Sequence, residues 1–189
     1  ALGLGLAAIV DARLVGLALV VLAIGAAYDL VAKGTPWSWL PFAVGIPILP
    51  IYGWFGATGT LPAFFAVLIP MAVLAGAALA VANARADLDA DRAAATASVA
   101  TVLGPVRSWW LDAGLMAAAT GVGVVLVGRA SWGLTTWILV VAGTLLVTLG
   151  LALGRGSTTR ARQRSWETQA VGAAVAATGW IAAMTQVGF

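Results

Sequence analysis

Three long stretches of this sequence carry no charged side chain, and they limit the fold more than any other feature. No Lys, Arg, Asp or Glu occurs in residues 34–84, 130–154 or 168–189. A membrane-spanning helix needs about 20 consecutive apolar residues, so each stretch can hold at least one span and the first can hold two. With 62% hydrophobic and 9% charged residues, the chain is far more apolar than a soluble domain. The sequence therefore predicts an integral membrane protein.

The fold class that we predict is all-α: a polytopic bundle of transmembrane helices that forms one domain over residues 1–189. Residues 1–10 are too short to span a membrane and are expected to be a partial helix. Pro41, Pro47 and Pro50 predict that the second span is kinked or broken. We expect six full spans, at residues 12–31, 37–55, 61–82, 109–127, 134–153 and 170–187.

Basic residues are divided unevenly between the two ends of these spans. One end receives Lys33, Arg85, Arg92, Arg107, Arg155, Arg160, Arg162 and Arg164. The other end receives only Arg13 and Arg129. Because cytoplasmic loops carry the excess of Lys and Arg, the first end is predicted to face the cytoplasm, and we expect a bacterial inner membrane. The net charge of +3 indicates contact with lipid headgroups rather than nucleic acid.

Tryptophans mark the predicted span ends. Interfacial anchors of this kind are typical of membrane proteins. Most of the nine tryptophans fall near these ends; the nine are Trp37, Trp39, Trp54, Trp109, Trp110, Trp132, Trp137, Trp166 and Trp180.

Residues 83–104 are the one stretch where several acidic groups collect. Asn83, Asp87 and Asp91 are four residues apart, so on a helix each step drifts only about 40° and the three form one polar stripe. Asp89 falls on the opposite side, where we expect Arg85 and Arg92 to neutralise it. The stripe has no basic residue on its own face and is therefore expected to attract a cation.

Asp87 and Asp91 are candidate ligands for Mg²⁺, which binds one or two carboxylates together with water and substrate phosphate oxygens. The chain has no Cys and no His, which excludes disulfides, zinc sites and thiol or imidazole nucleophiles. A diphosphate would complete the metal shell, with Lys33 and Arg92 as further anion partners. A solvated cytoplasmic charge run is the alternative interpretation.

Asp112 is a separate case, because it lies near the start of a predicted span. A carboxylate inside a membrane is a functional candidate by default. We expect instead a structural ion pair with Arg107.

At the acidic stretch the sequence resembles the UbiA-type intramembrane prenyltransferases. The second aspartate-rich motif of that family is N-x-x-x-D-x-x-x-D, then Gly four residues on, Thr or Ser seven on and Gly thirteen on. The sequence departs from it at Ala95, where the family has Gly. The residues that match are Asn83, Asp87, Asp91, Ser98 and Gly104.

A second cluster is similar to the Tyr and Lys that the family carries between its fourth and fifth helices. Tyr28 and Lys33 occupy these places, ahead of Trp37. The pattern of spans resembles helices four to nine of the nine-helix family fold.

The resemblance implies an Mg²⁺-dependent transferase. It would move a prenyl group from an allylic diphosphate to a lipophilic acceptor, often an aromatic ring in quinone, haem, chlorophyll or tocopherol synthesis. It implies that Asp87 and Asp91 ligate the metal and carry catalysis. Asn83, Tyr28 and Lys33 would contact the substrate.

The family's first aspartate-rich motif has no counterpart in the sequence, and three explanations are open. The chain is the C-terminal two-thirds of a longer enzyme, or a non-catalytic prenyltransferase-like subunit of a membrane complex with partner subunits, or one part of a split protein. Ala95 supports the second explanation. The acceptor, the prenyl chain length and the oligomeric state are outside what the sequence predicts.

Overall fold

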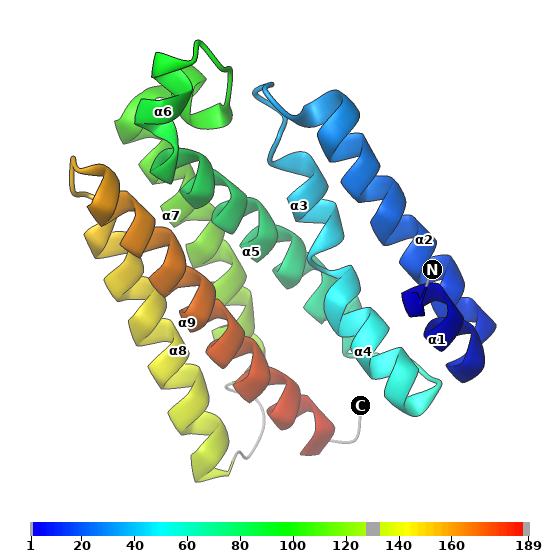
Figure 1. The fold of residues 1–189 in the computed structure, drawn as a ribbon. Helices are drawn as coiled ribbons and strands as arrows, with labels where there is room; N and C mark the ends of the chain where they lie inside the picture. The colour runs from blue at the N-terminus through cyan, green and yellow to red at the C-terminus, as the bar shows by residue number, and fades with distance from the viewer. Residues whose placement is uncertain (1, 128–132, 187–189) are drawn as a thin grey trace.

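The computed structural model describes residues 2–127 and 133–186. Every element within these ranges is helical, as the sequence predicts (Figure 1). Arg129, Trp132 and the predicted end of the last span at residue 187 lie outside the described residues.

The first half of the chain is built from short helices broken at polar or proline residues. Asp11 caps the second helix, because its carboxylate accepts a 2.7 Å hydrogen bond from the backbone N–H of Arg13. The predicted break in the second span is confirmed at Pro47, which separates two helices. The elements are α1 (Leu2–Val10), α2 (Ala12–Ala27), the π-helix η1 (Tyr28–Ala32), α3 (Leu40–Gly45) and α4 (Ile48–Thr58).

The second half contains the long helices. The last one begins well before residue 170, so Arg160, Arg162 and Arg164 are helical and not in a loop as expected. α7 kinks at Gly104, whose φ of 76° favours glycine, immediately before Pro105. The elements are α5 (Phe65–Ala86), α6 (Leu88–Ala93), α7 (Val99–Val127), α8 (Leu134–Leu153) and α9 (Thr159–Gln186).

Glycines let α8 and α9 pack with their backbones in contact. A Cβ atom on Gly143 would lie 2.4 Å from the backbone nitrogen of Ala176 and 2.6 Å from the carbonyl oxygen of Gly172. Small residues at such spacing are typical of helix pairs in membranes. α5 packs against α7 and α9 in the middle of the bundle, α3 joins it, and α2 lies at the outer edge (Figure 1).

Among the described residues, four segments are long and apolar enough to cross a membrane. α7 and α9, with 29 and 28 residues, are longer still but carry charged residues in their first halves. The chain is therefore an integral membrane protein, while the count of six spans and the correspondence to helices four to nine stay predictions. The four segments are Ala12–Ala32, Leu40–Thr58, Phe65–Ala86 and Leu134–Leu153.

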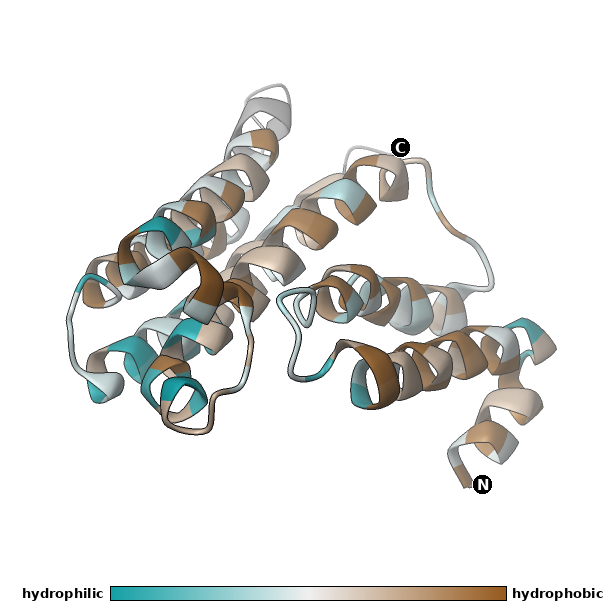
Figure 2. Cartoon of the chain, turned by 90° about the horizontal axis from the view of Figure 1, so that it is seen from above, coloured by the Kyte–Doolittle hydropathy of each residue, from teal (hydrophilic) through white to brown (hydrophobic). Residues whose placement is uncertain are grey.

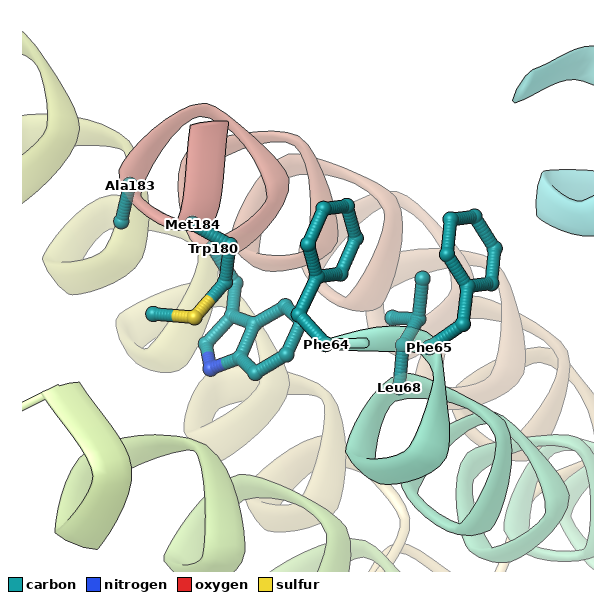
Figure 3. Packing of buried hydrophobic residues seen from close by; sticks show 6 residues of the cluster. All are labelled: Phe64, Phe65, Leu68, Trp180, Ala183 and Met184. Carbon is teal, nitrogen blue, oxygen red and sulfur yellow. The ribbon is translucent and has the colours of Figure 1, made fainter. Parts of the chain in front are cut away.

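An aromatic cluster closes the end of the bundle where α5 begins (Figure 3). The rings of Phe64 and Phe65 stack with centroids 5.0 Å apart, and Trp180 of α9 meets Phe64 edge-on at 6.1 Å. Because α6 follows the other end of α5, the cluster and the acidic stretch lie at opposite ends of the bundle (Figure 1). The buried members of the cluster are Phe64, Phe65, Leu68, Trp180, Ala183 and Met184.

Candidate functional site

Hydrophilic residues gather at the end of the bundle that carries α6, while the helix bodies are largely hydrophobic (Figure 2). The segment after η1 and the loop between α8 and α9 reach the same end (Figure 1). Segments far apart in the sequence can therefore contribute to one site there.

A pocket of about 220 Å³ at this end, which we name the polar pocket, brings the two predicted clusters together. It includes five of the six predicted site residues; Arg92 is exposed on α6 and does not line it. The sequence did not predict that Trp39 and Phe42, or Thr96 and Ala97 of the α6–α7 loop, line the site. The lining residues are Tyr28, Lys33, Gly34, Ser38, Trp39, Phe42, Ala80, Asn83, Ala84, Asp87, Asp91, Thr96, Ala97 and Ser98.

Asn83, Asp87 and Asp91 share one face although their helix is not continuous. α5 ends at Ala86, and Asp87 is the cap residue between α5 and α6. Backbone hydrogen bonds nevertheless run from Asp87 N to Asn83 O (3.2 Å) and from Asp91 N to Asp87 O (2.8 Å). This four-residue pattern is that of an α-helix, so the predicted stripe survives the break.

The two carboxylates of the polar pocket have no cationic partner in the described part of the chain. Burial raises the pKa of Asp87, and the nearby negative charge of Asp91 raises it further. A divalent cation between them would remove this repulsion. Residues 2–127 and 133–186 hold no group of three acidic, His or Cys ligands. Two carboxylates in an open pocket fit Mg²⁺, which takes its other ligands from water and phosphate oxygens.

The π-helix η1 places Tyr28 and Lys33 in the same pocket. The backbone N–H of Lys33 donates a 2.8 Å hydrogen bond to the carbonyl of Tyr28, five residues earlier. This wider turn aligns residues that an ordinary α-helix would separate, and such turns are frequent at functional sites. The Tyr28 ring packs edge-on against Phe42 of α3, with centroids 5.2 Å apart.

The loop after α6 shows why a Gly would suit position 95. Ala95 has a φ of 52°, in the left-handed region. Thr96 N donates to Asp91 O at 2.8 Å and Ala95 N donates to Arg92 O at 3.2 Å, which is the Schellman arrangement that ends many helices. The loop thus closes with Ala in the glycine position, at a cost in backbone strain. Ser98 then caps α7, its hydroxyl accepting from Thr101 N at 3.3 Å.

Of the two expected partners of Asp89, Arg85 was wrong, because it pairs with Asp112 instead. Thr159 and Arg162, both on α9, donate hydrogen bonds to its carboxylate. These two contacts lower the pKa of Asp89 most, and the charge of Arg92, the smallest of the causes, lowers it too. Arg162, which the sequence predicts only as one of the basic residues at the cytoplasmic end, has a side chain that is 5% exposed.

The expected pairing of Asp112 with Arg107 was also wrong. Asp112 Oδ2 lies 3.6 Å from Arg85 Nη1 and accepts a 3.2 Å hydrogen bond from Gln169 Nε2. Arg85 is 3% exposed and Asp112 is fully buried, so this network joins α5, α7 and α9 inside the bundle. The sequence signal for such a buried ion pair is a charged residue near the end of an apolar helix. The sequence does not show which of these residues pair.

A second pocket, of about 380 Å³, lies deeper in the bundle, and we name it the apolar pocket. On α5 its lining runs from Leu68 to Leu79, one residue short of Ala80 in the polar pocket. Trp180 of the aromatic cluster lines its far end, where the indole faces Gly123 of α7.

Fold and site together define a class: a polytopic, all-helical membrane protein with an acidic pocket at one end of the bundle. The UbiA prenyltransferase family model matches residues 1–174, which include every residue of the polar pocket, and the chain belongs to this family. The predicted resemblance is thereby confirmed. No curated protein and no solved structure matches the sequence. Family members are intramembrane prenyltransferases, generally metal-dependent, acting on prenyl diphosphates and lipophilic acceptors.

Proposed function

We propose that this chain transfers a prenyl group from an allylic diphosphate to a lipophilic, aromatic acceptor, and that the polar pocket binds the diphosphate. The observation that carries the proposal is that Lys33 and the pair Asp87 and Asp91, from distant parts of the chain, line one pocket. A cation and two metal-binding carboxylates are the groups that a metal-bound diphosphate requires.

Each residue has a distinct role in this proposal. Asp87 and Asp91 hold Mg²⁺, and the Asn83 amide orients the metal-bound diphosphate. Lys33 neutralises part of the diphosphate charge. Tyr28, whose ring packs against Phe42, donates a hydrogen bond to the diphosphate through its hydroxyl group. The bound metal would stabilise the negative charge that develops on the departing diphosphate. Arg92 lies outside the pocket lining and would act on the substrate only through its charge.

The reaction breaks the carbon–oxygen bond of the allylic diphosphate. The allylic carbocation that results is attacked by the acceptor ring, and the ring then loses a proton. The chain's own contribution is to hold the diphosphate and to keep water from the carbocation. We also propose that the acceptor comes from a pathway of the quinone, haem or chlorophyll type.

The apolar pocket supports a substrate with a long hydrocarbon tail. On α5 its lining ends at Leu79, next to Ala80 of the polar pocket, and its lining also includes Leu68 and Trp180 of the aromatic cluster. A diphosphate in the polar pocket would therefore have its tail among apolar side chains. The excess of basic residues at the α6 end further supports a site at the cytoplasmic face.

Transfer by an Asp91→Asn variant tests the proposal. The purified protein in lipid nanodiscs is given Mg²⁺, farnesyl diphosphate and a panel of aromatic acceptors, and product is measured by mass spectrometry. We expect Asp91→Asn to abolish transfer, because the amide cannot replace a carboxylate ligand.

Asp29→Asn is the matched control. Asp29 is an exposed acidic residue of η1 that does not line the polar pocket, so its loss should leave transfer unchanged. Wild-type turnover by Asp91→Asn would contradict the assignment of the site. A wild-type protein that binds the diphosphate but transfers to no acceptor would favour the non-catalytic subunit.

A further inference from the structure

Asp89 projects from α6 away from the polar pocket, and that side of α6 is attached to α9. Thr159 Oγ1 donates a 2.7 Å hydrogen bond to Asp89 Oδ2, and Arg162 Nη2 donates to the same oxygen within an ion pair. Arg162 is buried although it is charged. The rigid guanidinium fork suits an ion pair that fixes the relative position of two helices.

Arg162 is itself held by the loop between α8 and α9. Its Nη1 donates a 2.6 Å hydrogen bond to the carbonyl of Ser157. Arg85 reaches the same loop from α5, where its Nη2 donates to the carbonyl of Gly154, also at 2.6 Å. The loop is thus contacted by one arginine from α5 and one from α9.

The two attachments flank Asp87 in the sequence. Arg85 precedes it by two residues and Asp89 follows it by two, while Leu88 between them is 1% exposed. Arg85 and Leu88 therefore face the bundle, the more exposed Asp89 contacts α9, and Asp87 and Asp91 line the polar pocket. A segment attached on both sides of Asp87 cannot rotate about its axis without breaking one attachment.

We propose that Asp89 and Arg162 are positioning residues for Asp87 and Asp91. Neither lines the polar pocket; the pair holds α6 in the orientation that keeps both carboxylates there. The inference rests on the proposed function, in which these carboxylates bind Mg²⁺. Groups that orient metal ligands typically contribute roughly 10- to 100-fold to metal affinity.

The sign of the effect of Arg162→Gln separates positioning from simple electrostatics. If Arg162 mattered only as a charge, its loss would strengthen cation binding at a site nearby. If it positions α6, its loss weakens binding. We would measure Mn²⁺ binding by electron paramagnetic resonance with inorganic diphosphate present, on the protein in nanodiscs, and would record a melting curve for every variant.

We expect Arg162→Gln and Asp89→Asn each to weaken Mn²⁺ binding roughly 10-fold, at the lower end of that range. The double variant should be no weaker than the worse single one, since both changes remove the same interaction. Arg160→Gln is the matched control. It removes an exposed arginine from the same turn of α9 and should leave Mn²⁺ affinity unchanged or slightly stronger.

Mn²⁺ binding by folded Arg162→Gln that equals or exceeds that of the wild type overturns the inference. If that variant does not fold, Thr159→Val decides, because it removes one hydrogen bond to Asp89 without changing charge; unchanged affinity then overturns the inference. Asp91→Asn is measured in parallel. If it still binds Mn²⁺, the proposed function fails; if it does not, and Arg162→Gln binds as tightly as the wild type, the positioning role alone fails.

Discussion

Asp87 and Asp89 are two residues apart and have opposite electrostatic surroundings. Burial and Asp91 raise the pKa of Asp87, whereas Thr159 and Arg162 lower the pKa of Asp89. Asp89 therefore stays ionised in its ion pair under more acidic conditions than an ordinary aspartate. Asp87 is left without a cation, as expected for a group that meets its partner only when metal binds. In the proposed function, Asp89 has a structural role and Asp87 binds the metal.

Ala95 is the single residue where we predict that a substitution stabilises the protein. Ala95→Gly removes the strain of a left-handed Cβ-bearing residue, about 1 kcal/mol, partly offset by the greater freedom of Gly in the unfolded chain. A melting curve in detergent should show a higher midpoint.

Ala93→Gly provides the comparison, since Ala93 is the last residue of α6 and is exposed. Glycine at a helical position should lower the free energy of unfolding by about 1 kcal/mol, and the melting midpoint should fall with it. If Ala95→Gly lowered the melting midpoint as Ala93→Gly does, the claim that Ala95 is strained would be wrong.

At the scale of elements, the contact between α8 and α9 leaves no room for added atoms. The carbonyl of Gly143 would lie 2.8 Å from a Cβ atom on Gly172, and the corresponding Cβ on Gly143 meets backbone atoms of α9. Backbone atoms cannot yield as the end of a flexible side chain does. These helices carry the loop that Arg85 and Arg162 contact, so their spacing affects the position of α6.

We predict that Gly143→Ala destabilises the bundle by about 1 to 3 kcal/mol, the usual cost of overpacking. The change in melting midpoint is compared with that of Gly114→Ala on α7, where an added Cβ meets nothing within 4 Å. Equal midpoints for the two variants would show that the α8–α9 contact is looser than the structure has it.

Helix bounds and the spacing of residues along a helix could be predicted from the sequence better than the contacts between side chains of different helices. The bounds of α8 agree with the predicted span at 134–153, and the stripe of Asn83, Asp87 and Asp91 follows from helical spacing alone. The start of α9 was missed because a charged first turn looks like a loop until Arg162 is seen to be buried. The partner of Asp112 could not be predicted, since Arg85 lies on another helix and only packing brings the two together.

At the scale of the whole molecule, the two pockets divide the bundle into a polar end and an apolar interior. The apolar pocket ends at Trp180, whose indole N–H has no partner in the described part of the chain. In the proposed function this residue would limit how far a prenyl tail extends. Tail length would then depend on a residue at the opposite end of the bundle from the reacting carbon.

Trp180→Leu should therefore shift the preference toward longer prenyl diphosphates, because the smaller side chain lengthens the apolar pocket. The ratio of kcat/KM for geranylgeranyl and geranyl diphosphate measures this. Trp110→Leu, which replaces a tryptophan that is 63% exposed, should leave the ratio unchanged. An unchanged ratio for Trp180→Leu would exclude Trp180 as the limit.

The central claim is that the polar pocket holds a metal-bound diphosphate. A structure of the protein with Mg²⁺ and farnesyl thiodiphosphate, a slowly reacting analogue, tests it most directly. We predict density for a metal ion between Asp87 and Asp91, and for the thiodiphosphate against Lys33. A thiodiphosphate bound elsewhere, with both aspartates free of metal, would contradict the account.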